Sequence, residues 1–229
     1  MKKYSIFTLI LLAIASSAMS QDIKKTASIN KPFNISLTAG FAAPVGDFST
    51  TKGNEPGFAK VGYNFNLNFG YNINSRLGIA STAFYAYYKL NNKAINDLIG
   101  SGGPTSSSVT SDHWKYHGIV AGPMTTFELA ENVYLDLKFM AGFANVNFPV
   151  FKASGESSPE KWKAAYAMKM GGNVRYNLND KFCFYSSLDY FYTRPTWKFT
   201  ESVDGETIKS NISQRLESVN INVGIGYNF

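Results

Sequence analysis

The sequence is poor in cysteine and in charge. Cys183 is the one cysteine among 229 residues, so no internal disulfide can form and a disulfide-stabilised scaffold is excluded. Charged residues make up 17% of the chain, and its lysines and arginines are scattered rather than clustered. We therefore predict no nucleic-acid partner. No later segment reaches the ~18 uninterrupted apolar residues of a membrane-spanning helix, and apolar residues at helical spacing are scarce.

The N-terminus has the pattern of a secretory signal. Two lysines precede an uncharged apolar run at 4–14, and Ala18-Met19-Ser20 is a small-x-small site. This pattern predicts a cleaved signal peptide over 1–20 and export from the cytoplasm. Residues 21–32 lack periodicity and are predicted to be a flexible periplasmic segment. The remaining 33–229 are predicted to form one domain.

Strict alternation of apolar with small or polar residues dominates that domain. Between 61 and 73, for example, every odd position is apolar and every even one is Gly or Asn. Period-two alternation indicates a strand with one apolar face, and these runs approach the ~9–11 residues of a tilted membrane-crossing strand. The segments predicted as strands are 33–41, 61–73, 77–88, 114–127, 133–143, 165–177, 182–192 and 219–229. The facing of 77–88 and 114–127 is ambiguous, and Gly122-Pro123 predicts a bulge or kink.

The connections alternate in length. Three are tight (72–76, 128–132 and 177–181) and four are long and polar (42–60, 89–113, 149–163 and 194–215). An all-β, eight-stranded, antiparallel up-and-down transmembrane barrel places short periplasmic turns at one end and long extracellular loops at the other. Asp204-Gly205 is predicted to be a hairpin tip that extends the last two strands. Ten strands are the alternative, if part of a long loop pairs.

The composition of the two faces favours a membrane barrel over a water-soluble one. A soluble exterior would carry many lysines and glutamates, yet 61–73 holds no charge. Aromatic residues gather near both strand ends, as they do at membrane–water interfaces. We predict two aromatic belts: one near the turns, and one near the loops that also takes in Tyr116, Phe148 and Trp197. The main belt residues are Tyr71, Tyr134, Tyr176, Phe182, Tyr85, Tyr87, Trp114, Tyr190 and Tyr192.

The signal sequence, the alternating strands and the C-terminal Phe229 together resemble small bacterial outer-membrane β-barrels. The likeness is to the OmpA/OmpX-type and porin-like families of Gram-negative bacteria, and it covers nearly all of the mature chain. It implies location in the outer membrane, contact with its lipid and lipopolysaccharide, and recognition by the barrel-assembly machinery. The residues that would carry this assembly signal are Val223, Ile225, Tyr227 and Phe229.

Several polar and charged residues are predicted to face the lumen, where isolated charges would be costly. They could line a narrow conduit, or they could form a network of ion pairs and amides that plugs the barrel. These residues are Asn66, Asn68, Asp136, Lys138, Lys169, Asn173, Arg175 and Asp189.

No catalytic or metal-binding set is evident. His113 and His117 lie four residues apart on one strand, too far apart to chelate one metal, and Cys183 is predicted to be a buried, inert thiol. The Gly/Ser-rich run at 101–108 lacks the context of a phosphate loop. We expect no cofactor and a structural or surface-interaction (adhesin-like) role with an unidentified extracellular ligand. A narrow porin-like channel is the alternative, and an outer-membrane enzyme is the weaker one.

Overall fold

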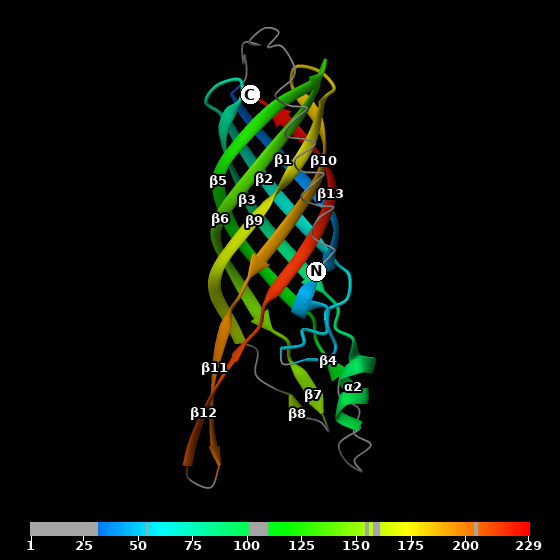
Figure 1. Ribbon diagram of the computed structural model, residues 1–229, viewed down its shortest axis with the longest axis vertical. Coiled ribbons are helices and arrows are strands. Elements are labelled where there is room, and N and C mark those ends of the chain that lie inside the picture. Colours follow the sequence, from blue (N-terminus) through cyan, green and yellow to red (C-terminus); the bar gives the residue numbers. More distant parts are fainter. Residues whose placement is uncertain (1–31, 54, 101–109, 154–155, 158–160, 204–205) are drawn as a thin grey trace, which may run out of the picture.

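The computed structural model describes residues 32–53, 55–100, 110–153, 156–157, 161–203 and 206–229. The predicted signal peptide, the segment before Pro32, the run at 101–108 and the tip at 204–205 lie outside them. The dominant feature is a closed antiparallel barrel (Figure 1). Its eight strands are β1 (Phe33–Pro44), β2 (Gly62–Asn72), β3 (Leu77–Tyr88), β5 (Trp114–Ala130), β6 (Val133–Phe148), β9 (Lys161–Asn177), β10 (Phe182–Thr193) and β13 (Leu216–Asn228).

Each barrel strand pairs with its neighbours along the chain, and the first and last strands close the ring. β1 pairs with β13 without a register shift from Asn34↔Asn228 to Pro44↔Ser218. The Phe229 N–H then donates to the Phe33 carbonyl at 2.9 Å. Closure leaves no unpaired barrel edge, and the C-terminus lies at the short-turn end, at the top of Figure 1. The predicted eight-stranded up-and-down barrel is confirmed.

The outer surface of the barrel is apolar all the way round. Every strand contributes an outward apolar side chain with between 39% and 64% of its area exposed. Such a continuous band cannot face water in a monomer and is typical of a barrel that crosses a membrane. The band includes Leu37, Phe65, Ile79, Ile119, Phe139, Met170, Leu188 and Ile221.

All the additional elements gather at the long-loop end (Figure 1). They are the 3₁₀ turn η1 (Gly46–Phe48), the helix α2 (Asn92–Gly100), a three-stranded sheet of β4 (Thr110–Ser111), β7 (Phe151–Ala153) and β8 (Glu156–Ser157), and the hairpin of β11 (Thr196–Val203) and β12 (Glu206–Ser213). Thus the predicted extension on both sides of 204–205 forms. Over the described residues, no helix is long and apolar enough to cross a membrane.

The bulge predicted at Gly122-Pro123 is wrong. The pairing of β5 with β6 skips these two residues but keeps its register, from Ala121↔Ala141 to Met124↔Lys138, and β3 pairs with Pro123 through Ile79. Proline removes a single ladder donor, and here the flanking pairs hold the register. The irregularity lies instead between Glu128 and Ala130, beside the short turn to β6.

Candidate functional site

The barrel interior holds two ion pairs, one near the short turns and one near the middle of the strands. Arg175 Nε lies 3.3 Å from Asp136 Oδ2, and the Thr126 hydroxyl donates to Asp136 Oδ1 at 2.7 Å. Lys169 Nζ lies 3.4 Å from Asp189 Oδ2. All four charged side chains are buried, so each pair compensates part of the cost of removing its members from water.

Amides and hydroxyls surround these pairs. Lys169 also donates to Asn66 Oδ1 at 2.7 Å, and Asn66 donates in turn to Asn64 Oδ1 at 2.7 Å. On the opposite side, Asn222 Nδ2 donates to the Ser187 hydroxyl at 3.1 Å. These side chains come from β2, β9, β10 and β13, so the polar network links strands that are not neighbours in the sheet.

The structure places all eight residues predicted for the lumen on the inward face. Asn68 accepts from Thr82 at 2.9 Å and donates to Ser36 and Thr38, while Asn173 is buried beside the ion pairs. Lys138 is buried too, but in the described part of the chain it has no ion pair within 4.0 Å. The network therefore contains three cations, Lys138, Lys169 and Arg175, and two anions, Asp136 and Asp189.

The half of the interior nearest the loops is aromatic. The rings of Tyr116 and Phe191 stack with centroids 4.6 Å apart, and Phe84 meets the Phe191 ring edge-on at 5.2 Å. The hydroxyls of Tyr88 and Tyr116 are 2.8 Å apart and buried. Offset and edge-to-face contacts of this kind stabilise packed rings beyond the area they bury, so this half of the barrel is a packed core.

The segment between β1 and β2 closes the mouth above this aromatic layer. Phe48 of η1 is fully buried and meets the rings of Tyr88 and Trp114 edge-on at 5.0 and 5.8 Å. Trp114 Nε1 donates to the Gly57 carbonyl at 2.9 Å. Two exposed ion pairs tie the segment to the rim, Arg194 with Glu55 at 2.9 Å and Arg215 with Asp47 at 3.5 Å. Sequence reasoning missed Phe48, because no periodic pattern surrounds it.

The assignment of Trp114 to an outer aromatic belt is wrong. Trp114 shares the inward face of β5 with Tyr116, and both are buried; neither belongs to the predicted outer belt. Phe148 and Trp197 pack with Trp114 in the same cluster. Trp114 points inward because it occupies the same alternate positions of β5 as Tyr116. The mouth of the barrel that these positions face is filled with aromatic rings rather than water. Phe148 and Trp197 are likewise interior residues.

Tyr134 is a second correction to the predicted belts. It is paired across strands with Arg175 and lies on the inward face of β6, where the Arg175 guanidinium sits 4.7 Å from the centre of its ring. A cation over an aromatic face is attracted to it, which gives this tyrosine an interior role. The other predicted belt residues face outward: Tyr71, Tyr85, Tyr87, Tyr176, Phe182, Tyr190 and Tyr192.

Close packing of the interior requires glycine at particular positions. A Cβ added to Gly226 on β13 would lie 2.5 Å from the ring of Tyr185 and 3.0 Å from Cys183 Sγ. Tyr185 and Cys183 are both buried on β10. Gly226 therefore leaves the space that the tyrosine ring fills, and Cys183 is a packed, free thiol.

The histidines lie at the rim. His113 Nδ1 is 2.6 Å from Asp112 Oδ1, and Lys115 Nζ is 3.0 Å from Asp112 Oδ2. Partial burial of Asp112 acts to raise its pKa, but the contacts with His113 and Lys115 outweigh burial and hold the pKa below its usual value. His117 lies beside Trp162, with ring centroids 5.2 Å apart. Within the described residues no group of three His, Cys, Asp or Glu could hold a metal ion.

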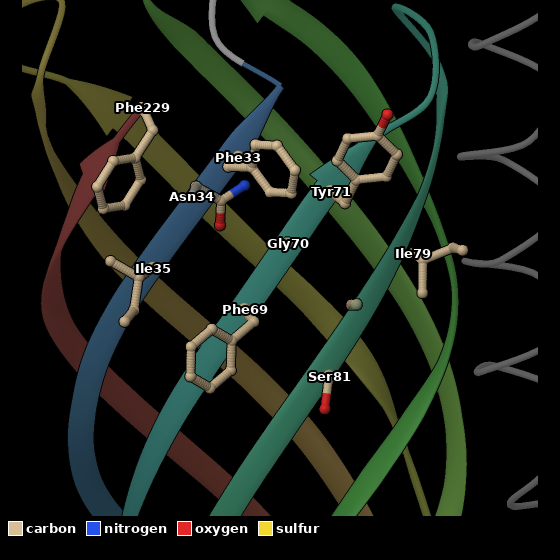
Figure 2. A pocket seen from close by; sticks show the side chains of 10 residues that line it. Phe33, Asn34, Ile35, Phe69, Gly70, Tyr71, Ile79, Ser81 and Phe229 are labelled. Atoms are coloured by element: carbon tan, nitrogen blue, oxygen red, sulfur yellow. The ribbon is translucent and has the colours of Figure 1, made fainter.

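A groove of 630 Å³ lies on the outer face near the short turns (Figure 2). Phe33, Phe69 and Tyr71 flank it, and Phe229 forms one end. Gly70 and Ser81 add little bulk to its floor, so the groove is a shallow part of the lipid-facing surface. The predicted assembly residues Val223, Ile225 and Tyr227 face the same side of β13 as Phe229.

The interior is closely packed around several inward side chains. Asn222, Thr82, Met140 and Tyr116, from four different strands, expose at most 2% of their area. A conducting pore would leave its lining side chains in contact with water, as larger barrels do. The arrangement is that of a closed barrel that is polar towards the short turns and aromatic at its loop-end mouth.

No protein-family model matches the chain, and no curated protein sequence does so. The structure is similar to that of a major outer membrane protein from Thermus thermophilus, with a TM-score of 0.54 and 12% identity over 87% of this chain and 100% of that one. It is also similar to Neisserial surface protein A (TM-score 0.49, 15% identity, 86% and 97% covered) and to Ail, the attachment invasion locus protein of Yersinia pestis (0.48, 18%, 86% and 99%). The likeness to the Thermus protein shows a shared fold, that of a small bacterial outer-membrane β-barrel.

Proposed function

We propose that the protein is a closed barrel of the bacterial outer membrane, exported through a cleaved signal peptide, with a structural and surface-interaction role. The observation that carries this proposal is the filled interior. Two buried ion pairs occupy the interior between the short turns and the middle of the strands, and packed rings with Phe48 occupy the mouth at the loop end. What remains available to other molecules is the loop end, where α2, β4, β7, β8 and the β11–β12 hairpin gather.

Conductance in planar bilayers tests the closed state. We expect the purified, refolded barrel to give no steady openings, because no water-accessible path crosses the packed levels of the interior. The control is Phe48→Ala, which removes the ring that seals the mouth but leaves both ion pairs in place. Steady, reproducible openings of the unmodified protein would contradict the closed barrel.

A narrow channel for small solutes is the second candidate, and Lys138 is the observation that favours it. Among the described residues, no carboxylate lies within 4.0 Å of this inward lysine, so the polar network has an excess of positive charge. A rearrangement of the two ion pairs would open a path for small anions. If this candidate is correct, Lys138→Met would change the size or selectivity of openings. If the barrel is closed, Lys138→Met changes only the stability of the folded protein and produces no openings.

We propose no catalytic activity. In the described chain, His113 and Lys115 are engaged with Asp112 at the rim, and His117 lies against Trp162 on the outer face. Neither histidine is joined to a nucleophile. Hydrolysis of lipid or peptide substrates by the purified barrel, lost in His117→Ala, would contradict this proposal.

A further inference from the structure

One chain of hydrogen bonds inside the barrel starts at an ammonium group. Lys169 Nζ donates to Asn66 Oδ1 at 2.7 Å, and Asn66 Nδ2 donates to Asn64 Oδ1 at 2.7 Å. An ammonium can only donate, so Asn66 turns its carbonyl oxygen to Lys169 and its amide nitrogen to Asn64. The carbonyl oxygen of Asn64 is therefore occupied, and its amide nitrogen, a donor, forms the end of this chain.

A second chain starts at the carboxylate of the same ion pair. Asp189 Oδ2, which lies 3.4 Å from Lys169 Nζ, also accepts from Asn222 Nδ2 at 3.4 Å. A carboxylate can only accept, so Asn222 turns its amide nitrogen to Asp189. The carbonyl oxygen of Asn222, an acceptor, forms the end of this second chain.

The two chain ends lie on either side of a glycine. Gly40 of β1 pairs with Asn64 of β2 on one side and with Asn222 of β13 on the other. A Cβ added to Gly40 would lie 2.8 Å from Asn222 Oδ1, so the amide of Asn222 leans over the glycine. Both asparagines are buried, and among the described residues neither Asn64 Nδ2 nor Asn222 Oδ1 has a hydrogen-bond partner. A donor and an acceptor thus flank a strand position that carries no side chain.

The chemistry of these two atoms defines what can join them. The joining group must accept from an amide N–H and donate to an amide carbonyl. A cation would be repelled by the N–H of Asn64 and an anion by the carbonyl of Asn222, whereas a water molecule both accepts and donates. One water bridges atoms ~5.5–6 Å apart, since each of its hydrogen bonds is ~2.8–3.0 Å long. Ordered water commonly satisfies buried polar groups that have no protein partner.

We propose that one ordered water molecule lies over Gly40, where it accepts from Asn64 Nδ2 and donates to Asn222 Oδ1. This inference rests on the proposed closed interior, because only a site sealed from bulk water holds a single molecule for long. The water joins the two chains into a closed circuit of hydrogen bonds that ties β2, β9, β10 and β13 together. In order, the circuit runs through Lys169, Asn66, Asn64, the water, Asn222 and Asp189.

The test is nuclear magnetic resonance of the refolded, isotopically labelled barrel in detergent micelles. It measures magnetisation transfer between water and the α-protons of Gly40, one of which points inward where a side chain would begin. We expect a slowly exchanging water beside Gly40 in the unmodified protein and its loss in Asn64→Leu, which removes the donor. The matched control is Asn68→Leu, on the same strand and face, because the amide of Asn68 is already bonded to Ser36, Thr38 and Thr82. This control should keep the water.

Absence of a slowly exchanging water beside Gly40 in the unmodified protein would overturn the site, and this measurement decides alone if Asn64→Leu does not fold. Retention of the water in Asn64→Leu, or an equal loss in Asn68→Leu, would also overturn it. A shift of the Gly40 signals on addition of bromide would assign the position to an anion instead. Conductance is measured separately: steady openings of a barrel that keeps this water would contradict the closed-barrel proposal alone, and a silent barrel without it would contradict only this inference.

Discussion

Individual side chains inside the barrel bind partners on neighbouring strands. Arg175 shows this most clearly, since it joins Asp136 through two nitrogens at 3.3 and 3.4 Å and also lies over the Tyr134 ring. Because both charges are buried, removing one partner leaves the other without compensation. The cost of such a change exceeds the benefit of the intact pair.

Arg175→Gln is expected to destabilise the barrel by about 3–5 kcal/mol, the usual cost of leaving a buried charge unpaired. The measurement is the midpoint of thermal or urea unfolding in detergent. Arg175→Gln/Asp136→Asn should recover much of the loss, because neither charge then remains buried. Arg76→Gln, in a short turn, is the control. An unchanged midpoint in Arg175→Gln, together with altered conductance, would favour the channel candidate.

At Gly226 a single added methyl group would meet the buried ring of Tyr185 at 2.5 Å. Gly226→Ala should lower the unfolding midpoint by an amount typical of overpacking, about 1–3 kcal/mol, because Tyr185 cannot move away inside the barrel. Gly172→Ala is the matched control, since its added Cβ would meet the flexible ends of outward leucines at 3.0 and 3.6 Å. Equal midpoints for the two variants would show that the barrel interior around Gly226 has room for an added methyl group.

At the scale of elements, the segment over the mouth acts as a plug held from two directions. Phe48 anchors the segment inside the barrel, while the ion pairs of Asp47 and Glu55 hold it at the rim. Surface ion pairs contribute ~0–1 kcal/mol each, whereas a buried phenylalanine contributes several. The aromatic anchor therefore dominates the stability of the plug.

Phe48→Ala should cost about 3–5 kcal/mol and release the segment from the mouth. Limited trypsin digestion measures the release, because Lys52 is exposed within it and should be cut faster in the variant. Leu98→Ala, which truncates an exposed side chain of α2, should leave the rate unchanged. Cutting at the same rate in Phe48→Ala and the unmodified protein would mean that the ion pairs alone hold the segment.

The elements differ in how far the sequence alone could predict them. Period-two alternation predicted all eight strands, and the alternation of short and long connections predicted their order. Alternation could not reveal the facing of 114–127, because Gly122-Pro123 predicts a bulge or kink within it, and the sequence alone then places Trp114 outside. It also could not reveal the plug, because Phe48 is buried by contacts with residues distant in sequence.

For the site, sequence reasoning located the inward charges but not their partners. The pairs Arg175–Asp136 and Lys169–Asp189 join neighbouring strands, β9 with β6 and β9 with β10, and depend on the register between them. A sequence shows where a residue lies along its strand, whereas the register between strands requires the fold.

At the scale of the whole molecule, closure depends on the last residues of the chain. Phe229 donates its N–H to the Phe33 carbonyl, and its ring contacts Tyr227 with centroids 4.8 Å apart. It makes few contacts with the interior and 60% of its area is exposed. Its contribution to the finished barrel is therefore small, which is consistent with the proposed role in assembly.

Deleting Phe229 should impair insertion more than it weakens the folded barrel. The comparison is the yield of membrane-inserted protein in cells against the unfolding midpoint of the protein that does fold. Phe182→Ala is the control, because Phe182 is an exposed aromatic at the same end but on β10. Normal insertion of the truncated chain would remove the assembly role from the terminal residue.

The distribution of tryptophan in this fold has a practical consequence. All three tryptophans lie at the loop end: Trp114 and Trp197 are buried in the mouth, and Trp162 is exposed on the outer face. Tryptophan fluorescence of the protein, excited selectively, therefore reports on this one end and is silent about the other. A lipid-soluble quencher would reach Trp162 first, while a water-soluble quencher would reach Trp114 and Trp197 only when the mouth opens. The native chain thus carries its own optical reporter of whether the barrel is shut.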